Sequence, residues 1–233
     1  MTELTLTPRT RLKRRPQRGS YDREVVNAIL DEGFVCHVAF TIDGQPGVIP
    51  TVYARGGDWL YLHGARANRM LNALLEPGHD SCVSVTHVDA LVLARSAFHH
   101  SVNYRSVIVY GQAQEVTDPD EKLEALRLVV EHTIPGRWKD VRWPNADEFR
   151  QTLVVKLAIA EGSAKIRALG VIDDEADLSQ GCWAGLLPIR TSYGPAERDP
   201  ALPEDIPLPS YVENHARGPK LFSAGKLVAS RIR

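Results

Sequence analysis

Two arginines and an asparagine follow a glycine at the point where a strand-like run gives way to a helix-like one. The segment reads Tyr61-Leu62-His63-Gly64-Ala65-Arg66-Ala67-Asn68-Arg69-Met70. A chain that turns from a strand into a helix leaves free backbone N–H groups at the helix N-terminus, and these groups favour an anion. Arg66 and Arg69 would add charge-assisted donors that suit phosphate. The segment therefore predicts a phosphate site, and a loop with solvated arginines, which the local sequence alone favours, is the alternative.

Polar residues also interrupt the strand-like run from Val102 to Gly111. Strand alternation places Asn103 and Arg105 on one face, and Tyr104 and Ser106 on the other. One of these faces is expected to be core, so its polar groups need partners. A ligand groove and a salt bridge at the rim of a barrel explain this pattern equally well.

The remaining reactive side chains favour structural interpretations. His99 and His100 are adjacent on an extended segment and would point to opposite faces, so they do not predict a shared metal. His37 is expected to be a buried, hydrogen-bonded histidine, whereas cofactor contact and a structural role are balanced for His63. The sequence predicts no catalytic residue and no metal site. Small buried hydrophobes are expected at the cysteines Cys36, Cys82 and Cys182, and a solvated loop at the acidic run Asp173, Asp174, Glu175 and Asp177.

Length and composition place the chain among ordinary globular proteins. It has 233 residues, of which 43% are hydrophobic, and a formal net charge of −1. That charge gives no field to attract nucleic acid, and no apolar run reaches the roughly 20 residues that span a bilayer. The basic N-terminus has no apolar signal segment after it, so we expect a cytoplasmic protein without nucleic-acid or membrane partners.

Periodicity predicts an antiparallel protein with few helices. Helices are expected after Asp22, over 68–76 and after Asp118, with a further helical segment opening at Asp147. The pair Asp43-Gly44 predicts a hairpin turn. Strands are expected over 34–40, 47–54, 59–63, 81–88, 91–94, 102–111 continuing to 116, 152–159 and 181–189. This order favours a closed or nearly closed barrel over a βαβ sheet. We expect a basic arm over 1–19, one domain over 20–190 and a proline-rich tail over 191–233.

Four ordered segments carry a resemblance to a known family. They are the run from Ala90 to Gly111, Leu62 to Arg69, Lys165-Ile166-Arg167, and Trp183-Ala184-Gly185 with Leu187-Pro188. Together they resemble the pyridoxamine 5′-phosphate oxidase-like, flavin-nucleotide-binding proteins, in the branch that includes nitroimidazole-reductase-type proteins. The resemblance implies a mainly β, antiparallel split barrel that forms a homodimer with FMN in a groove between the subunits.

The resemblance also implies roles for individual residues. The backbone of Ile49, Pro50, Thr51 and Val52 would lie along the flavin ring. His63, Gly64, Asn68 and Arg69 would hold the phosphate, with Arg66 replacing a cation that relatives often have at the position of Met70. Further cofactor contacts would come from Tyr104, Arg105, Ser106 and Trp183. Ala168-Leu169-Gly170-Val171 departs from the glycine and prolines that the family has after its lysine-x-arginine.

Three functions follow as hypotheses. The first is an FMN-dependent oxidoreductase that passes electrons from a reduced nicotinamide to a small acceptor, with the cofactor supplying the chemistry. The second is an enzyme of the same fold that uses deazaflavin F420 or haem, with His63 or His37 as the haem ligand. The third is a flavin carrier or sensor without turnover.

Overall fold

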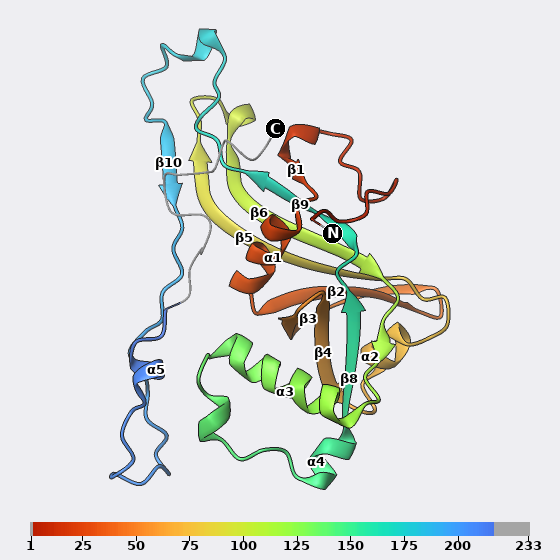
Figure 1. The fold of residues 1–233 in the computed structure, drawn as a ribbon. Helices are drawn as coiled ribbons and strands as arrows, with labels where there is room; N and C mark the ends of the chain where they lie inside the picture. The colour runs from red at the N-terminus through yellow and green to blue at the C-terminus, as the bar shows by residue number, and fades with distance from the viewer. Residues whose placement is uncertain (1, 217–233) are drawn as a thin grey trace.

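The computed structural model describes residues 2–216, and the fold is an antiparallel split β-barrel with short helices (Figure 1). The longer helices are α1 (Arg23–Glu32), α2 (Arg69–Leu74), α3 (Pro119–Thr133), α4 (Ala146–Gln151) and α5 (Ser210–Glu213). Single 3-10 turns are η1 (Pro16–Arg18), η2 (Ala97–His99), η3 (Trp138–Asp140) and η4 (Glu175–Asp177). No helix among the described residues is long and apolar enough to cross a bilayer.

Ten strands form one continuous sheet in the order β1-β9-β6-β5-β2-β3-β4-β8-β7, with β10 paired to β5. The strands are β1 (Gly19–Ser20), β2 (Val35–Ile42), β3 (Gln45–Gly56), β4 (Trp59–Ala65), β5 (Ser81–Leu93), β6 (Ser101–Gly111), β7 (Gln114–Glu115), β8 (Thr152–Ala158), β9 (Glu161–Arg167) and β10 (Gly185–Pro188). In Figure 1 the sheet coils around itself, with α1 against its inner side and α3 packed beside β3, β4 and β8.

Helix caps and a hairpin turn form at the residues where the sequence predicts them. Asp22 caps α1 by accepting a hydrogen bond from the Glu24 N–H at 2.8 Å, and Asp118 caps α3 in the same way from Glu121 at 2.8 Å. Asp43 and Gly44 both have positive φ, 50° and 73°, as a tight hairpin turn requires. The antiparallel sheet described above confirms the predicted fold class.

Several boundaries in the prediction were wrong. The two strands expected over 81–94 form one strand, β5, with a bulge between Val88 and Ala90. The stretch expected to continue β6 to Val116 instead forms β7, because Val116 is buried in a second core cluster with Ala125 and Val154 and draws the chain toward β8. The last strand is limited to Gly185–Pro188, and Asn145, rather than Asp147, caps α4.

The basic N-terminal segment is not wholly a solvated arm. Leu4 is buried in the main core, and Thr10 is also buried. Arg9 forms ion pairs with Glu161 at 2.6 Å and with Asp80 at 2.5 Å, while its guanidinium covers the Tyr110 ring. This part of the basic segment therefore packs onto the fold, while Lys13, Arg14 and Arg15 are exposed.

The other corrections concern single residues and the tail. Cys36 is buried as expected, whereas Cys82 is half-buried and Cys182 is exposed. From Thr191 to residue 216 nearly all side chains are exposed, and the boundary of the tail at 191 stays a prediction. The rest of the expected tail, 217–233, lies outside the described residues.

A close backbone approach at Gly162 gives a stability prediction. A Cβ at this position would lie 2.6 Å from the Ile108 carbonyl oxygen and 3.3 Å from a Leu4 methyl. We expect Gly162→Ala to lower the free energy of unfolding by about 1–3 kcal/mol, because the backbone of β6 cannot move aside cheaply. Gly170→Ala, where a Cβ meets nothing within 4 Å, is the matched control. Equal midpoints for the two variants in urea unfolding would contradict the prediction.

Candidate functional site

The turn between β4 and α2 has the local structure that the sequence predicts. Asn68 caps α2 by accepting a hydrogen bond from the Leu71 N–H at 3.1 Å. Gly64 lies beneath this cap, where an added Cβ would come within 3.1 Å of Asn68 Nδ2. Met70 points into the core, which explains why this position carries no cation. With only six residues, α2 provides a weak dipole, so anion binding at this turn depends on side chains.

The two arginines of this turn have different surroundings. Arg66 Nη1 donates to Glu115 Oε1 at 2.8 Å, so its charge is already paired. Arg69 is exposed and forms no ion pair with another described residue. It lines a cavity of about 400 Å³ together with Phe40, Ile42, Asp43, Gln45, Pro46, Gly47, Ile49 and Met70. The structure thus brings Arg69 next to Ile49 and leaves Arg66 outside the cavity.

The first half of β3 has one edge without a strand partner among the described residues. β3 pairs with β2 from Gln45 to Val52, but with β4 only from Tyr53 to Gly56. The Tyr53 N–H bonds to Phe34 on the β2 side, so by alternation the even-numbered residues turn their polar backbone groups to the free edge.

Proline gives this free edge an unusual hydrogen-bonding pattern. Pro46 and Pro50 supply carbonyls but no N–H, while Val48 and Val52 supply both groups. Prolines on an edge also discourage pairing with a further strand. The result is an apolar edge with a few fixed donors and acceptors, which suits a flat heterocycle. The backbones of Ile49 and Thr51, also predicted as ring contacts, turn toward β2 instead.

His63 lies half-buried on β4, opposite Val154. Its Nδ1 atom is buried and lacks a hydrogen-bond partner among the described residues. Burial lowers the pKa of His63, so the neutral imidazole is the form that the fold favours. An orphaned nitrogen beside the turn is consistent with cofactor contact, the role predicted for this residue.

The lowered pKa of His63 has a consequence for stability. The folded state resists protonation, while the unfolded chain takes up the proton near the ordinary pKa of about 6.5. Stability is therefore expected to fall as pH decreases from about 7 to 5, and to fall less steeply in His63→Gln. Thermal midpoints measured across this range test the prediction. His37→Gln, at an exposed histidine of β2, is the control, and identical slopes for His63→Gln and wild type would contradict it.

The three predicted contact residues of β6 are divided between its faces as alternation requires. Arg105 is buried on the core face, where Asp89 accepts at 2.7 Å and Glu32 at 2.8 Å. Burial alone would lower the pKa of Arg105, but the hydrogen bonds to both carboxylates outweigh it and raise the pKa. Arg105 is thus held in an internal ion-pair network. Tyr104 and Ser106 lie half-buried on the opposite face.

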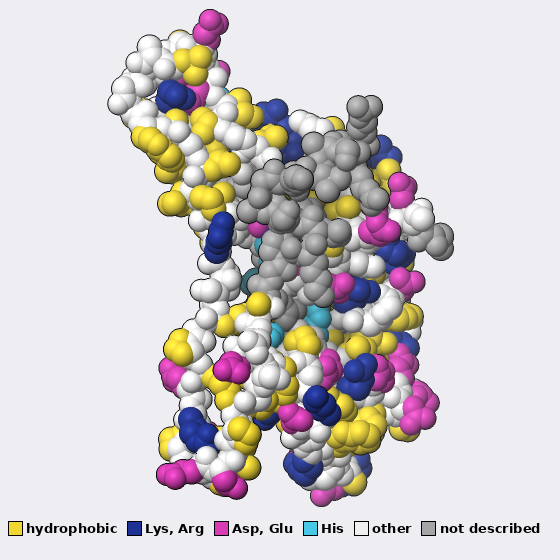
Figure 2. Space-filling view, turned by 60° about the vertical axis from the view of Figure 1, so that its left-hand side comes forward, with side chains coloured by type: hydrophobic (Ala, Val, Ile, Leu, Met, Phe, Trp, Pro, Cys, Tyr) yellow, Lys and Arg dark blue, Asp and Glu magenta, His cyan; other side chains and the backbone are white. Residues whose placement is uncertain are grey.

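Trp183 and His37 are both exposed, Trp183 in the segment before β10 and His37 on β2. Trp183 is 69% exposed and packs beside Gly185 in the projecting segment that contains β10. Figure 2 shows hydrophobic side chains gathered on this projection, where Leu178, Leu186 and Leu187 are exposed. In Figure 1, β10 and α2 lie at opposite ends of the molecule, so one chain does not bring Trp183 to the turn at α2. His37, expected to be buried, is exposed on β2 opposite Pro50.

A second groove, larger than the cavity beside Arg69, is not predicted by the sequence. It has a volume of about 630 Å³ and lies between η1, η2 and the end of β9. Its lining residues are Arg14, Arg15, Gln17, Arg18, Phe98, His99, His100, Ser101, Lys165, Arg167, Leu169 and Ile172. The basic run and the Lys165-x-Arg167 pair were visible separately, but only the pairing of β1 with β9 brings them together.

Comparisons with known proteins agree with this architecture. Residues 22–166 match a family model described as pyridoxamine 5′-phosphate oxidase. A search of curated proteins finds no match. Flavocytochrome Anf3 from Azotobacter vinelandii is 41% identical, with a TM-score of 0.83 over 88% of this chain and 95% of the other.

Two further solved structures are similar. The FAD and heme binding protein from Mycobacterium smegmatis is 34% identical, with a TM-score of 0.80 over 84% of this chain and 95% of its own. A protein from Bacteroides thetaiotaomicron, proposed to be a 5-nitroimidazole antibiotic resistance protein, shares the fold. It is 20% identical, with a TM-score of 0.54 over 74% of this chain and 90% of the other.

Proposed function

Because this chain belongs to the pyridoxamine 5′-phosphate oxidase family, we propose that it is a flavin-binding oxidoreductase. A reduced nicotinamide would supply electrons, and a small acceptor would take them. When bound, the flavin supplies the redox chemistry, and the protein binds it, orients it and excludes water. The observation that best supports this proposal is the free, proline-containing edge of β3 beside the cavity lined by Arg69 and Ile49.

The residues present fit the FMN portion of a flavin, which FAD also contains. Val48 and Val52 would donate from the free edge to ring acceptors, and the Pro50 carbonyl would accept from a ring N–H. Arg69 would pair with the phosphate, with Gly64 and Asn68 keeping the turn compact. His63, whose Nδ1 lacks a partner, would contact the same cofactor.

A second copy of the chain would complete this site. Val35, Val48 and Val88 are all more than 40% exposed on β2, β3 and β5, which is unusual for adjacent strands of one sheet. We propose that two copies pair across this face, and that Trp183 of the second copy shields the ring. Sedimentation at micromolar concentration tests the pairing, and a monomer with bound flavin would contradict it. The cytoplasmic location expected from the sequence remains a prediction.

The first experiment is the absorbance spectrum of the purified full chain, followed by mass analysis of the released cofactor. A flavin spectrum with the mass of FMN supports the cofactor expected from the sequence. The mass of FAD would identify FAD as the cofactor instead, and the mass of a deazaflavin would identify F420. A colourless protein that fails to bind added FMN or FAD would contradict flavin binding. Anaerobic mixing with NADH or NADPH then tests turnover, since a bound flavin that is not reduced favours the carrier or sensor hypothesis.

Haem as an additional cofactor is a second candidate. Two relatives above 30% identity are named as a flavocytochrome and as an FAD and heme binding protein. Histidine is one of the side chains that hold haem iron, and a haem site of this kind would combine an imidazole with a free nitrogen, apolar surfaces and cations for the propionates. A Soret band in the purified or haem-reconstituted protein would support this candidate.

A further inference from the structure

The groove between η1, η2 and β9 has a strong positive charge, and its described lining contains no carboxylate. Five of its lining residues are arginines or lysine, namely Arg14, Arg15, Arg18, Lys165 and Arg167. None of the five forms an ion pair with a described residue, although arginines elsewhere in the described chain commonly do. Such a concentration of cations in a concave surface predicts an anionic ligand.

Two of these arginines have buried guanidinium atoms and no carboxylate partner among the described residues. Arg18 has a buried Nε atom without a hydrogen-bond acceptor among the described residues. Arg167 is only 4% exposed, and among the described residues its guanidinium bonds only to neutral acceptors: the Asn103 amide oxygen and the carbonyls of Leu169 and Gly170. A buried charge without a counter-ion is costly, and bound carboxylates would remove that cost.

The histidines of the groove differ in their hydrogen bonds. His100 Nδ1 lies 3.0 Å from the Ser96 carbonyl oxygen and, as a donor to it, leaves the Nε2 lone pair free. A histidine held by its other ring nitrogen in this way is the common arrangement of metal ligands. His99 Nε2 faces Asp174 Oδ2 at 3.2 Å instead, so His99 is the weaker candidate.

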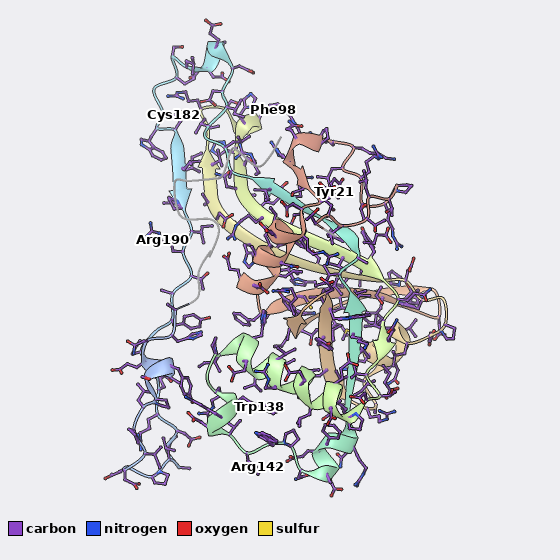
Figure 3. The ribbon with its side chains drawn as sticks, viewed as in Figure 1. Tyr21, Phe98, Trp138, Arg142, Cys182 and Arg190 are labelled. Atoms are coloured by element: carbon purple, nitrogen blue, oxygen red, sulfur yellow. The ribbon has the colours of Figure 1, made fainter. Side chains whose placement is uncertain are left out.

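Apolar side chains complete the walls of the groove. Leu169 and Ile172 are 45% and 54% exposed, and the Phe98 ring is 89% exposed at the rim, far from the α3 end of the molecule (Figure 3). The volume of about 630 Å³ lies within the range of small-molecule and cofactor pockets. The groove thus combines cations, a free imidazole nitrogen and apolar walls. A flat apolar ligand that carries carboxylates and a metal matches all three features.

We propose that this groove binds haem, in which the imidazole of His100 would hold the iron and Arg18 and Arg167 would pair with the propionates. The proposal rests on haem being the second cofactor and assigns its site away from His63 and His37, the histidines first considered. A nucleotide would also satisfy the cations, but it would make no use of the free imidazole nitrogen.

The test compares histidine variants of the full chain after reconstitution with hemin. For His100→Ala we expect an altered Soret band, haem affinity lower by about tenfold or more, and recovery of the spectrum with added imidazole. His63→Ala and His37→Ala should keep the wild-type haem spectrum. Circular dichroism and thermal midpoints confirm that each variant is folded, and flavin content is measured separately, so a failure of flavin binding is distinguishable from a failure of this proposal.

A second pair of variants tests the arginines. Arg18→Ala and Arg167→Ala should speed haem dissociation while preserving the position of the Soret band, and Arg127→Ala at an exposed position of α3 is the control. Three outcomes would overturn the proposal: a folded wild-type chain that binds no hemin, an unchanged haem spectrum in His100→Ala, or arginine variants that lose affinity for FAD or NADPH while haem binding is unaltered. The last outcome would assign the groove to a nucleotide.

Discussion

Replacing Arg105 by alanine is expected to lower the free energy of unfolding by about 3–5 kcal/mol. Arg105 is 4% exposed and bonds to two carboxylates from different elements, Glu32 at the end of α1 and Asp89 in the bulge of β5. Removing the guanidinium takes away the positive charge that these two acids share near the core. Urea unfolding followed by circular dichroism measures the loss.

The control for this prediction is an arginine with an exposed partner. Arg127 pairs with Glu124 one turn away on α3, and both side chains are largely exposed. Exposed pairs of this kind contribute about 0–1 kcal/mol, so Arg127→Ala should change stability little. If Arg105→Ala instead left stability intact and weakened flavin binding, Arg105 would be a ligand-binding residue, as the resemblance implies.

Short-range signals in the sequence were sufficient to predict the helices and turns. They were not sufficient to predict the side-chain ion pairs that connect these elements. Asp22, Asp118 and Asp43-Gly44 each act within a few residues, so caps and the hairpin turn could be predicted. The partners of Arg105 could not be predicted, because Glu32 is 73 positions away in the sequence. Asp89 interrupts the strand-like pattern and indicated a break, although it lies at a bulge within a continuous strand.

The candidate sites differ in the same respect, since one is continuous in sequence and the others form only when distant strands pair. The turn at 64–69 is continuous in sequence, so its residues could be named from the sequence. The groove combines residues 14–18 with Lys165 and Arg167, and these meet only because Gly19 pairs with Lys165 across the sheet. The free edge of β3 also depends on pairing, because β3 pairs with β4 only from Tyr53 onward and residues 45–52 stay open on one side.

Arg69→Ala is expected to weaken flavin binding by about 10- to 100-fold, the value of a hydrogen bond to a charged group. Arg69 is the arginine of this turn that lines the cavity with Ile49, and it has no carboxylate partner among the described residues. Its guanidinium is therefore free to pair with a phosphate. Titration of the apoprotein with FMN or FAD, followed by quenching of flavin fluorescence, measures the change.

Arg66→Ala is the matched control, and here the structure reverses the expectation from the sequence. The sequence assigned Arg66 to the place of the cation missing at Met70, which predicts a clear loss of affinity. In the fold, Arg66 is paired with Glu115 at 2.8 Å and lies outside the cavity. Its removal should change flavin affinity by less than about threefold, in keeping with an exposed pair worth about 0–1 kcal/mol. A larger loss from Arg66→Ala than from Arg69→Ala would mean that flavin binding breaks the pair with Glu115 and that Arg66 carries the phosphate.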